Sequence, residues 1–213
     1  MTERPILFTP GNVRAILDGH KTQTRRIVKP EPLCDVEWFG QLHTAGPDDG
    51  LWFPMKGNPK DCDEWVQADG DTVRCPYGVV GDRLYVREGL ERSKNLIGVS
   101  YRSDGEPVGP IPTGGWYRWE WHRDTLSPIH MPKWAARLWL EIVEVRVERL
   151  QEISREDAIA EGITLHPAHH HRSSASIYGP VATYRDLWES INGAGSWDTN
   201  PWVWAITFKL VMP

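Results

Sequence analysis

The sequence predicts an α+β domain built around a small, partly open β-barrel with a few short helices. An apolar fraction of 40% supports a real core, and twelve Trp beside four Phe favour large amphipathic rings within it. The predicted strands are short and change their buried face, and only a few small helices join them. The regular alternation of strands and helices that a doubly wound sheet needs is absent.

The length of 213 residues is greater than that of a common domain. We expect one domain over residues 1–213 with a long, loop-rich insertion at about residues 31–74. No hydrophobic period persists in that insertion, and Pro, Gly and Asp are frequent there. Its isolated rings, Trp38, Trp52 and Trp65, are expected to pin it to the body of the domain.

Three short helices are predicted from capping residues and helical spacing. The first follows Thr9, which can cap free N–H groups, and ends at Gly19. The second covers residues 154–161, where a capping pattern precedes a glycine stop. The third runs from about residue 179 to residue 192, with its apolar residues on one side.

The predicted strands carry apolar residues at every second position. They cover residues 22–28, 83–87, 137–148 and 202–211. In the segment 137–148 the apolar positions change phase at Val143, so the buried face changes midway. A bulge or a bend at a barrel corner produces such a change.

The net charge of −5 is concentrated in residues 46–72, which we call the acidic stretch. This stretch holds seven acids and two lysines, and the rest of the chain holds 22 residues of each sign. Residues 20–29 contain no acid and four cations: Lys21, Arg25, Arg26 and Lys29. Because a polyanion responds to local potential, the net charge does not exclude a nucleic-acid partner.

Residues 16–25 read Ile-Leu-Asp-Gly-His-Lys-Thr-Gln-Thr-Arg. This segment resembles the Ile-Leu-x-Gly-x-Lys-Thr-x-Thr-Arg signature of the ASCH domain family, which has the PUA-like fold. Further similar pieces are Gly-Asp before a strand, Glu-Asp-Ala-Ile-Ala-Glu-Gly and Trp-x-Ile-x-Phe, at residues 81–82, 156–162 and 204–208. The chain resembles the longer, Trp-rich members found in phages and prophages over roughly residues 4–30 and 75–211.

The resemblance implies binding of RNA or a modified nucleoside in a cleft beside the barrel. Small members of the family hydrolyse the acetyl amide of N4-acetylcytidine, and other members are described as ribonucleases. In the amidohydrolases the resemblance maps the base to Lys21, the nucleophile to Thr24 and the acid to Glu161. This chain is about twice as long as those small enzymes.

Lys21 and Thr24 can act as base and nucleophile only under certain chemical and geometric conditions. A Thr hydroxyl needs a base, and a Lys serves as one only when burial or nearby cations lower its pKa. Strand positions three apart face opposite sides, so Lys21 and Thr24 converge only if Lys21 belongs to the turn after Gly19. Otherwise Lys21 is a solvated charge, Thr24 a strand former and Glu161 ordinary helix surface.

The cations Arg25, Arg26 and Lys29 are predicted to contact phosphates, with Trp or Tyr rings nearby to stack on unpaired bases. The alternative is a solvated strand face that deters edge pairing. A non-catalytic RNA-binding module, a ribonuclease and a phage assembly accessory protein remain alternatives to the amidohydrolase. The last of these would bind a protein partner through the Trp-rich insertion.

No metal and no cofactor is expected. Cys34, Cys62 and Cys75, with His43 as a fourth candidate ligand, contain no Cys-x-x-Cys pair. Three cysteines also suit a reducing compartment better than a disulfide framework. No apolar run reaches the length of a membrane span and the chain starts without a secretory pattern, so we expect a cytoplasmic protein without membrane contact.

Overall fold

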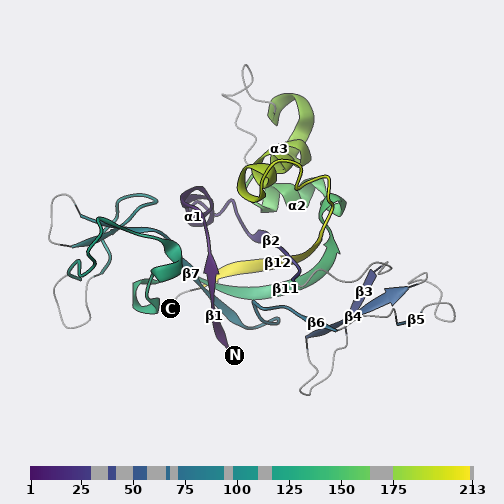
Figure 1. Cartoon of the computed structure of the whole chain (residues 1–213), viewed down its shortest axis with the longest axis horizontal. Coiled ribbons are helices and arrows are strands. Elements are labelled where there is room, and N and C mark those ends of the chain that lie inside the picture. The colour runs from purple at the N-terminus through teal and green to yellow at the C-terminus, as the bar shows by residue number, and fades with distance from the viewer. Residues whose placement is uncertain are drawn as a thin grey trace.

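The computed structural model describes residues 1–29, 38–41, 50–56, 66–67, 72–93, 98–109, 117–163 and 175–211. A five-stranded mixed sheet forms its centre, in the order β1-β7-β11-β12-β2 (Figure 1). Its strands are β1 (Glu3–Leu7), β2 (Gln23–Ile27), β7 (Arg83–Arg87), β11 (Trp139–Arg149) and β12 (Trp202–Val211). Strand β1 runs parallel to β7, and the other neighbours are antiparallel.

The long strand β11 contains the irregularity that its sequence predicts. Its register against β12 shifts between Ile142 and Glu144, which leaves Val143 as the extra residue. Ile142 and Val145 are buried, whereas Val143 is exposed. A bulge therefore changes the buried face midway along the strand, and β11 and β12 curve together through the molecule (Figure 1).

The described strands form no closed barrel, so the predicted α+β class is confirmed but the sheet is open. Its two edges are β1 and β2, each of five residues with one neighbour. At the seam between these edges, Arg26 Nη2 on β2 donates to the carbonyl of Leu7 on β1 at 2.6 Å. A side chain thus bridges the seam where a closed barrel would have a backbone ladder.

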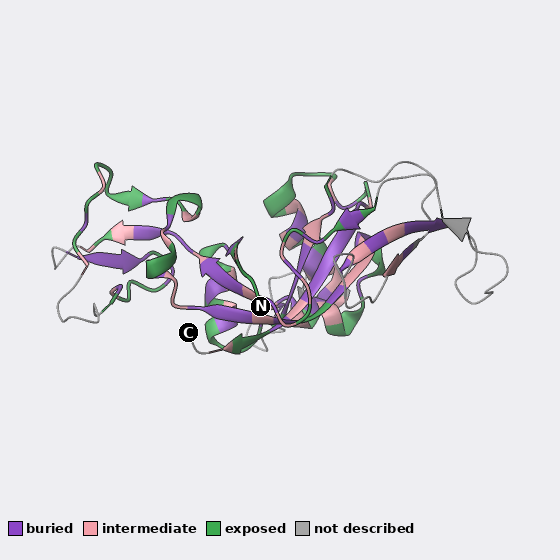
Figure 2. Ribbon diagram, turned by 90° about the horizontal axis from the view of Figure 1, so that it is seen from below, coloured by how far each residue is buried: buried purple, intermediate pink, exposed green. Residues whose placement is uncertain are grey.

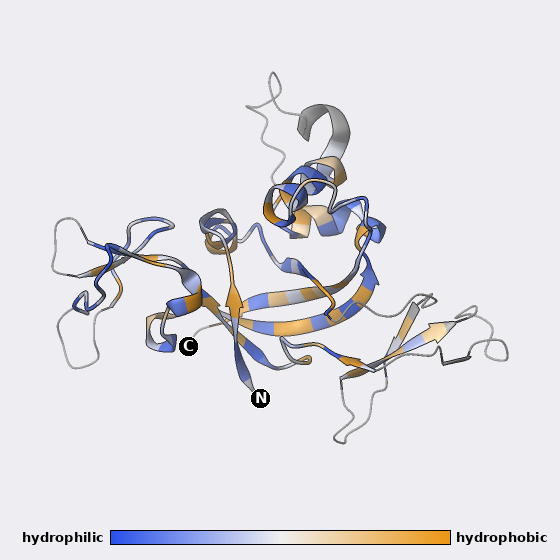
Figure 3. Cartoon of the chain, in the orientation of Figure 1, coloured by the Kyte–Doolittle hydropathy of each residue, from blue (hydrophilic) through white to orange (hydrophobic). Residues whose placement is uncertain are grey.

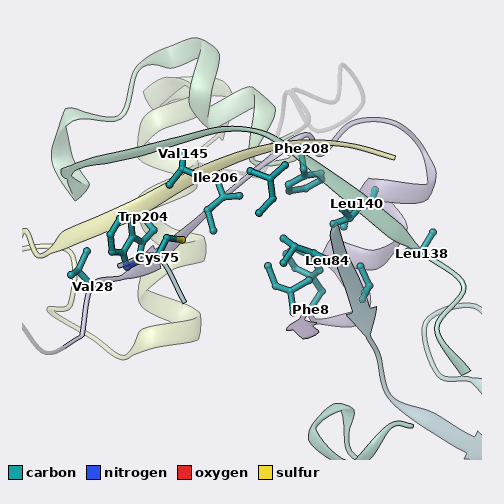
Figure 4. Packing of buried hydrophobic residues seen from close by; sticks show 14 of the residues in the cluster. Phe8, Val28, Cys75, Leu84, Leu138, Leu140, Val145, Trp204, Ile206 and Phe208 are labelled. Atoms are coloured by element: carbon teal, nitrogen blue, oxygen red, sulfur yellow. The ribbon is translucent and has the colours of Figure 1, made fainter. Parts of the chain in front are cut away.

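The main core lies against β7, β11 and β12. Apolar and polar residues alternate along the two long strands (Figure 3). The side chains of Leu84, Leu140, Trp204 and Ile206 are almost fully buried, and the close view shows Leu84, Leu140 and Phe8 packed together under the sheet (Figure 4). Alternation with one buried face is what fixes the strand register here.

Short strands occupy the described parts of the predicted insertion. They are β3 (Trp38–Gln41), β4 (Leu51–Lys56), β5 (Val66–Gln67) and β6 (Val73–Arg74). Strands β3, β5 and β6 each pair with β4. Trp52 packs edge-on against Trp204 at 6.1 Å between ring centroids, and Phe39 against Trp202 at 5.0 Å. Trp52 therefore packs on the main core, as predicted for a ring of this segment. Trp65 and the side chain of Trp38 lie outside the part that the structure describes.

A separate three-stranded sheet with its own buried residues was not predicted (Figure 2). It contains β8 (Leu90–Arg92), β9 (Val99–Tyr101) and β10 (Thr125–Leu126), followed by the short 3-10 helices η1 (Pro128–His130) and η2 (Lys133–Ala135). Buried Glu88 accepts from Arg137 Nε at 2.8 Å and from Ser103 Oγ at 2.7 Å. This contact joins the small sheet to the end of the main one.

The three predicted helices are present as α1 (Pro10–Leu17), α2 (Arg155–Ala160) and α3 (Ala175–Asn192), with the 3-10 helix η3 (Leu150–Glu152) before α2. Thr9 caps α1 and Ser154 caps α2 through their hydroxyls. The backbone of Gly179 is not helical, so a kink separates residues 175–178 from the helix that continues from Pro180 to Asn192. Within the described part of the chain, no helix combines the length and apolarity that crossing a bilayer requires.

Candidate active site

Lys21 belongs to the turn that follows α1. Gly19 adopts a left-handed backbone with φ of 74°, and the amides of His20 and Lys21 both donate to the carbonyl of Ala15, at 2.8 and 2.9 Å. Strand β2 starts only at Gln23. The condition under which Lys21 and Thr24 can face the same space is therefore met.

Glu161 lies beside Lys21 because helix α2 ends there. Glu161 is the residue that ends α2, and the following Gly162 turns the chain with φ of 94°. Lys21 and Glu161 then form an isolated antiparallel bridge, and the amide of Thr22 donates to the carbonyl of Ala160 at 2.8 Å. Two glycine turns distant in sequence thus place these two backbones together.

The side chains of Lys21 and Glu161 form a buried ion pair. Lys21 Nζ donates to Glu161 Oε2 at 2.6 Å and to the Glu161 carbonyl at 2.8 Å. Only 2% and 4% of these side chains are exposed. Burial lowers the pKa of Lys21, and the charges of Arg26 and Arg25 act in the same direction against the attraction of Glu161.

A cavity of about 280 Å³ opens beside this pair. Thr24, only 3% exposed, lines this cavity together with Lys21 and Glu161, so all three predicted catalytic residues meet there. Leu187 and Trp188 of α3 supply an apolar wall. The cavity therefore combines an amine, a hydroxyl and a carboxyl group with an apolar wall.

Arg25 has a different position from the one expected. Its Nε and Nη2 donate to Glu148 at 2.9 and 2.6 Å, Nη2 also donates to Asp157 at 2.9 Å, and Nη1 donates to Gln23 at 2.7 Å and to Glu161 at 3.4 Å. A guanidinium has five N–H donors, so all are used. The side chain is fully buried. Arg25 also lines the cavity, but its donors are all engaged, so the predicted contact with a phosphate would require it to release one of these partners.

Arg26 and Lys29 lie at the cavity, and their predicted contact with phosphate stays a prediction. Both line the cavity, with Arg26 half-buried and Lys29 exposed. The Arg26 guanidinium lies 5.1 Å from the centre of the Phe8 ring. Among the described residues neither side chain has a carboxylate partner, unlike Arg25. The cavity rim therefore carries uncompensated positive charge.

Tyr184 of α3 also reaches the site, although its spacing in the sequence indicates only the apolar side of that helix. Its hydroxyl donates to Glu161 Oε1 at 3.4 Å. Burial, together with the charge of Glu161, raises the pKa of Tyr184 well above its usual value, so the phenol stays protonated. Its spacing with Leu187 and Trp188 gave a packing signal, and the contact with Glu161 depends on tertiary structure.

The candidate zinc ligands do not assemble within the described residues. Cys34, Cys62 and His43 lie outside them. Cys75 is buried, and burial raises the pKa of its thiol to about 11. Among the side chains that the structure describes, no group of three or more His, Cys, Asp or Glu is arranged to hold a metal ion.

No protein-family model matches this chain, and no curated protein matches it. A comparison with solved structures finds the high-resolution crystal structure of an ASCH domain from Lactobacillus crispatus JV V101. The sequence identity is 12% and the TM-score is 0.39, over the whole of this chain and 81% of that one. This is the family that the sequence resembles.

Proposed function

We propose that the cavity hydrolyses the acetyl amide of an N4-acetylated cytidine. The observation that carries the proposal is the buried Lys21 Nζ, 2.6 Å from the Glu161 carboxylate in a cavity that Thr24 also lines. Desolvating both members of an ion pair costs free energy that packing alone would not require. Such a perturbed pair beside a cavity is typical of a catalytic site.

The short hydrogen bond between Lys21 and Glu161 supplies the proton states that the reaction needs. In the ion pair, Lys21 is an ammonium group and Glu161 is a carboxylate. Transfer of one proton across the 2.6 Å bond gives a neutral amine and a neutral acid. Burial disfavours the ammonium form of Lys21 relative to water, which lowers the pKa of Lys21. The neutral amine can then act as a base and the neutral acid as a proton donor.

The bond changes follow from these roles. Lys21 Nζ takes the proton of the Thr24 hydroxyl, and Oγ1 attacks the acetyl carbon. The bond from that carbon to N4 breaks as Glu161 protonates the leaving nitrogen, which releases cytidine and leaves the acetyl group as an ester on Thr24. Glu161, now a carboxylate, takes a proton from water, and the resulting hydroxide attacks the ester carbon. The bond from that carbon to Thr24 Oγ1 breaks, the Lys21 ammonium returns its proton to Oγ1, and acetic acid leaves, so that Lys21, Thr24 and Glu161 regain their starting proton states. The Tyr184 phenol donates to Glu161 and positions its carboxyl group.

Release of acetate from N4-acetylcytidine, followed by mass spectrometry, tests the proposal. Thr24→Val keeps the shape and removes the hydroxyl, and we expect it to reduce turnover at least about a hundredfold. Thr22→Val is the matched control, because Thr22 is exposed and outside the cavity. Equal losses in both variants, or full activity in Thr24→Val, would refute the nucleophile assignment.

The base and the acid are tested separately. Lys21→Arg keeps the positive charge but cannot accept a proton near neutral pH, so turnover should disappear while binding of the substrate survives better. Glu161→Gln should lower turnover by removing the proton donor. In the parent protein the competent pair shares one proton, so activity should fall as rising pH removes it, over a range below the pKa of a free Lys because burial lowers the pKa of Lys21. A Lys21→Arg variant with parental turnover would refute this mechanism.

A non-catalytic RNA-binding module is the second candidate, and the rim charges favour it. Arg26 and Lys29 line the cavity without carboxylate partners among the described residues. Such a module would bind RNA with an affinity that falls as salt rises, and it would leave both the acetyl group and the RNA chain intact. Unmodified RNA incubated in parallel separates this function from that of a ribonuclease, which would shorten the chain.

A further inference from the structure

A second cavity, of about 240 Å³, lies next to the candidate active site. Pro5, Leu7, Arg26, Tyr77 and Arg87 line it. Arg26 and Tyr77 also line the first cavity, so these two side chains separate the two spaces. The second cavity sits at the open seam of the main sheet, where Arg26 from β2 reaches the carbonyl of Leu7 on β1.

The two charged residues of this cavity are both arginines with unused hydrogen-bonding capacity. Among the residues that the structure describes, Arg26 donates one hydrogen bond, from Nη2 to Leu7, and Arg87 donates one, from Nη1 to the carbonyl of Ile129 at 3.0 Å. The Nε atoms of both are buried and have no partner among these residues. Within the described part of the chain neither guanidinium meets a carboxylate. Buried donors left in this state favour a ligand that supplies acceptors.

Arg25 shows that this fold can neutralise a guanidinium fully. Arg25 and Arg26 are adjacent on β2, yet the first meets three carboxylates and the second meets none. The difference follows from the side of the strand on which each lies: Arg25 faces Glu148 and α2, whereas Arg26 faces the seam and Phe8. Positive charge is therefore left at the seam, beside the space that the nucleoside would occupy.

We propose that the second cavity binds a phosphate group attached to the nucleoside held in the first cavity. Guanidinium groups bind phosphate oxygens through paired, charge-assisted hydrogen bonds. A protonated Tyr77 phenol at the boundary adds a donor, since burial raises its pKa. The substrate is then a nucleotide unit rather than a free nucleoside. This inference rests on the proposed function for the nucleoside and adds the anion subsite.

Direct binding tests the inference without relying on hydrolysis. The probes are cytidine, its 5′-monophosphate, its 3′-monophosphate and the dinucleotide CpC, each titrated by calorimetry. We expect at least one phosphate-bearing probe to bind about tenfold or more tightly than cytidine, because charged hydrogen bonds add to the affinity. This advantage should shrink as salt rises. Equal affinity for all four probes, or no binding by any of them, would overturn the proposal.

Variants of two arginines test whether the second cavity causes the preference for phosphate-bearing probes. Arg87→Gln should reduce the ratio of nucleotide to cytidine affinity to within about twofold, since it removes one guanidinium and leaves the first cavity intact. Arg83→Gln is the matched control, because Arg83 lies on the same strand, also has an unpartnered Nε and lines neither cavity. An advantage that survives Arg87→Gln, or that Arg83→Gln removes equally, would place the phosphate elsewhere.

The same probes distinguish the source of the phosphate. Equal affinities for a monophosphate and for CpC identify the terminal phosphate of a free nucleotide, and a further gain for CpC identifies a phosphodiester within RNA. Both outcomes support the subsite. Failure of the proposed hydrolysis is a separate result: acetate would not be released from acetylated substrates, while the preference for phosphate-bearing probes and its loss in Arg87→Gln would remain.

Discussion

Replacing Arg25 should destabilise the protein strongly, although the residue lies in a segment whose charge pattern suggests ligand binding. Its side chain is fully buried, and it pairs with Glu148, Asp157 and Glu161. Arg25→Met would leave these carboxylates without their shared cation. Removing one partner of a buried pair costs about 3–5 kcal/mol. Because 15% and 22% of the Glu148 and Asp157 side chains are exposed and water can compensate in part, we expect the lower value, about 3 kcal/mol.

Thermal unfolding at neutral pH measures this loss. For a chain of this size, 1 kcal/mol corresponds to a shift in Tm of roughly 2–4 °C, so Arg25→Met should melt roughly 6–12 °C lower than the parent. Arg26→Met is the matched control: Arg26 is its neighbour, is half-buried and has no carboxylate partner among the described residues. The control should melt within about 2 °C of the parent.

The pH dependence provides an independent check. Burial alone would raise the pKa of Asp157, but the charges of Arg25 and Arg146 hold it below its usual value. A carboxylate with a lowered folded pKa contributes stability above its unfolded pKa and loses it as the pH falls through the folded pKa. The gap between parent and Arg25→Met should therefore be widest near pH 7 and narrow below about pH 4. Melting temperatures that differ by less than about 2 °C, with no dependence on pH, would refute the structural role of Arg25.

Three further outcomes are expected. Gly162→Ala should lose roughly 1–3 kcal/mol of stability and lower turnover, since the φ of Gly162 is 94° and a new Cβ would lie 3.2 Å from the Cβ of Lys21. Gly193→Ala is its control: with φ of 100° and open space around a new Cβ, it should lose stability but not turnover. By urea unfolding, Trp52→Ala should cost about 3 kcal/mol and reproduce most of the loss caused by replacing the acidic stretch with a Gly/Ser linker. The double variant Arg26→Ala/Lys29→Ala should weaken RNA binding and flatten its dependence on salt, and an unchanged slope in filter binding would place the contacts elsewhere.

The elements with strong local signals were predictable from sequence. Strands β7 and β12 match the predicted residues 83–87 and 202–211, and helices α1 and α2 start at their predicted caps. Hydrophobic alternation and side-chain capping are encoded within a few residues, so no tertiary information is needed. The bulge at Val143 was also visible, because a phase change in alternation is itself a local pattern.

The missed elements depend on distant partners. Strand β1 contains Pro5 and shows no clear alternation, and it is a strand because it pairs in parallel with β7, about 80 residues later. The strands of the insertion are two to six residues long, and β4 contains Pro54. Short strands without a period carry too little signal for a sequence pattern, although the fold can stabilise them by packing aromatic rings such as Trp52 on its core.

The candidate site also contains residues that the sequence predicts and one whose role depends on distant partners. Family resemblance pointed to Lys21, Thr24 and Glu161, and the turn after Gly19 removed the geometric objection to their convergence. The role of Arg25 was not predictable, because its partners lie 123 and 132 residues away on β11 and α2. A count of charges within ten residues treats all four cations alike. Only the three-dimensional arrangement separates an internal counter-ion from a charge at the cavity rim.

The arrangement of these charges affects the pKa of Lys21, and with it the ability of Lys21 to act as the proposed base. A lysine that faces only Glu161 would be held as ammonium by that carboxylate. Here Glu161 is shared, because Arg25 and Tyr184 also donate to its Oε1, each at 3.4 Å. These donors draw charge toward the oxygen that Lys21 does not contact, and Arg25 and Arg26 both disfavour an ammonium at position 21. Burial is the main cause of the lowered pKa of Lys21, and Arg25 adds to it after Arg26. If Lys21 is the base, a variant at Arg25 should therefore lose more turnover than its melting temperature alone would explain.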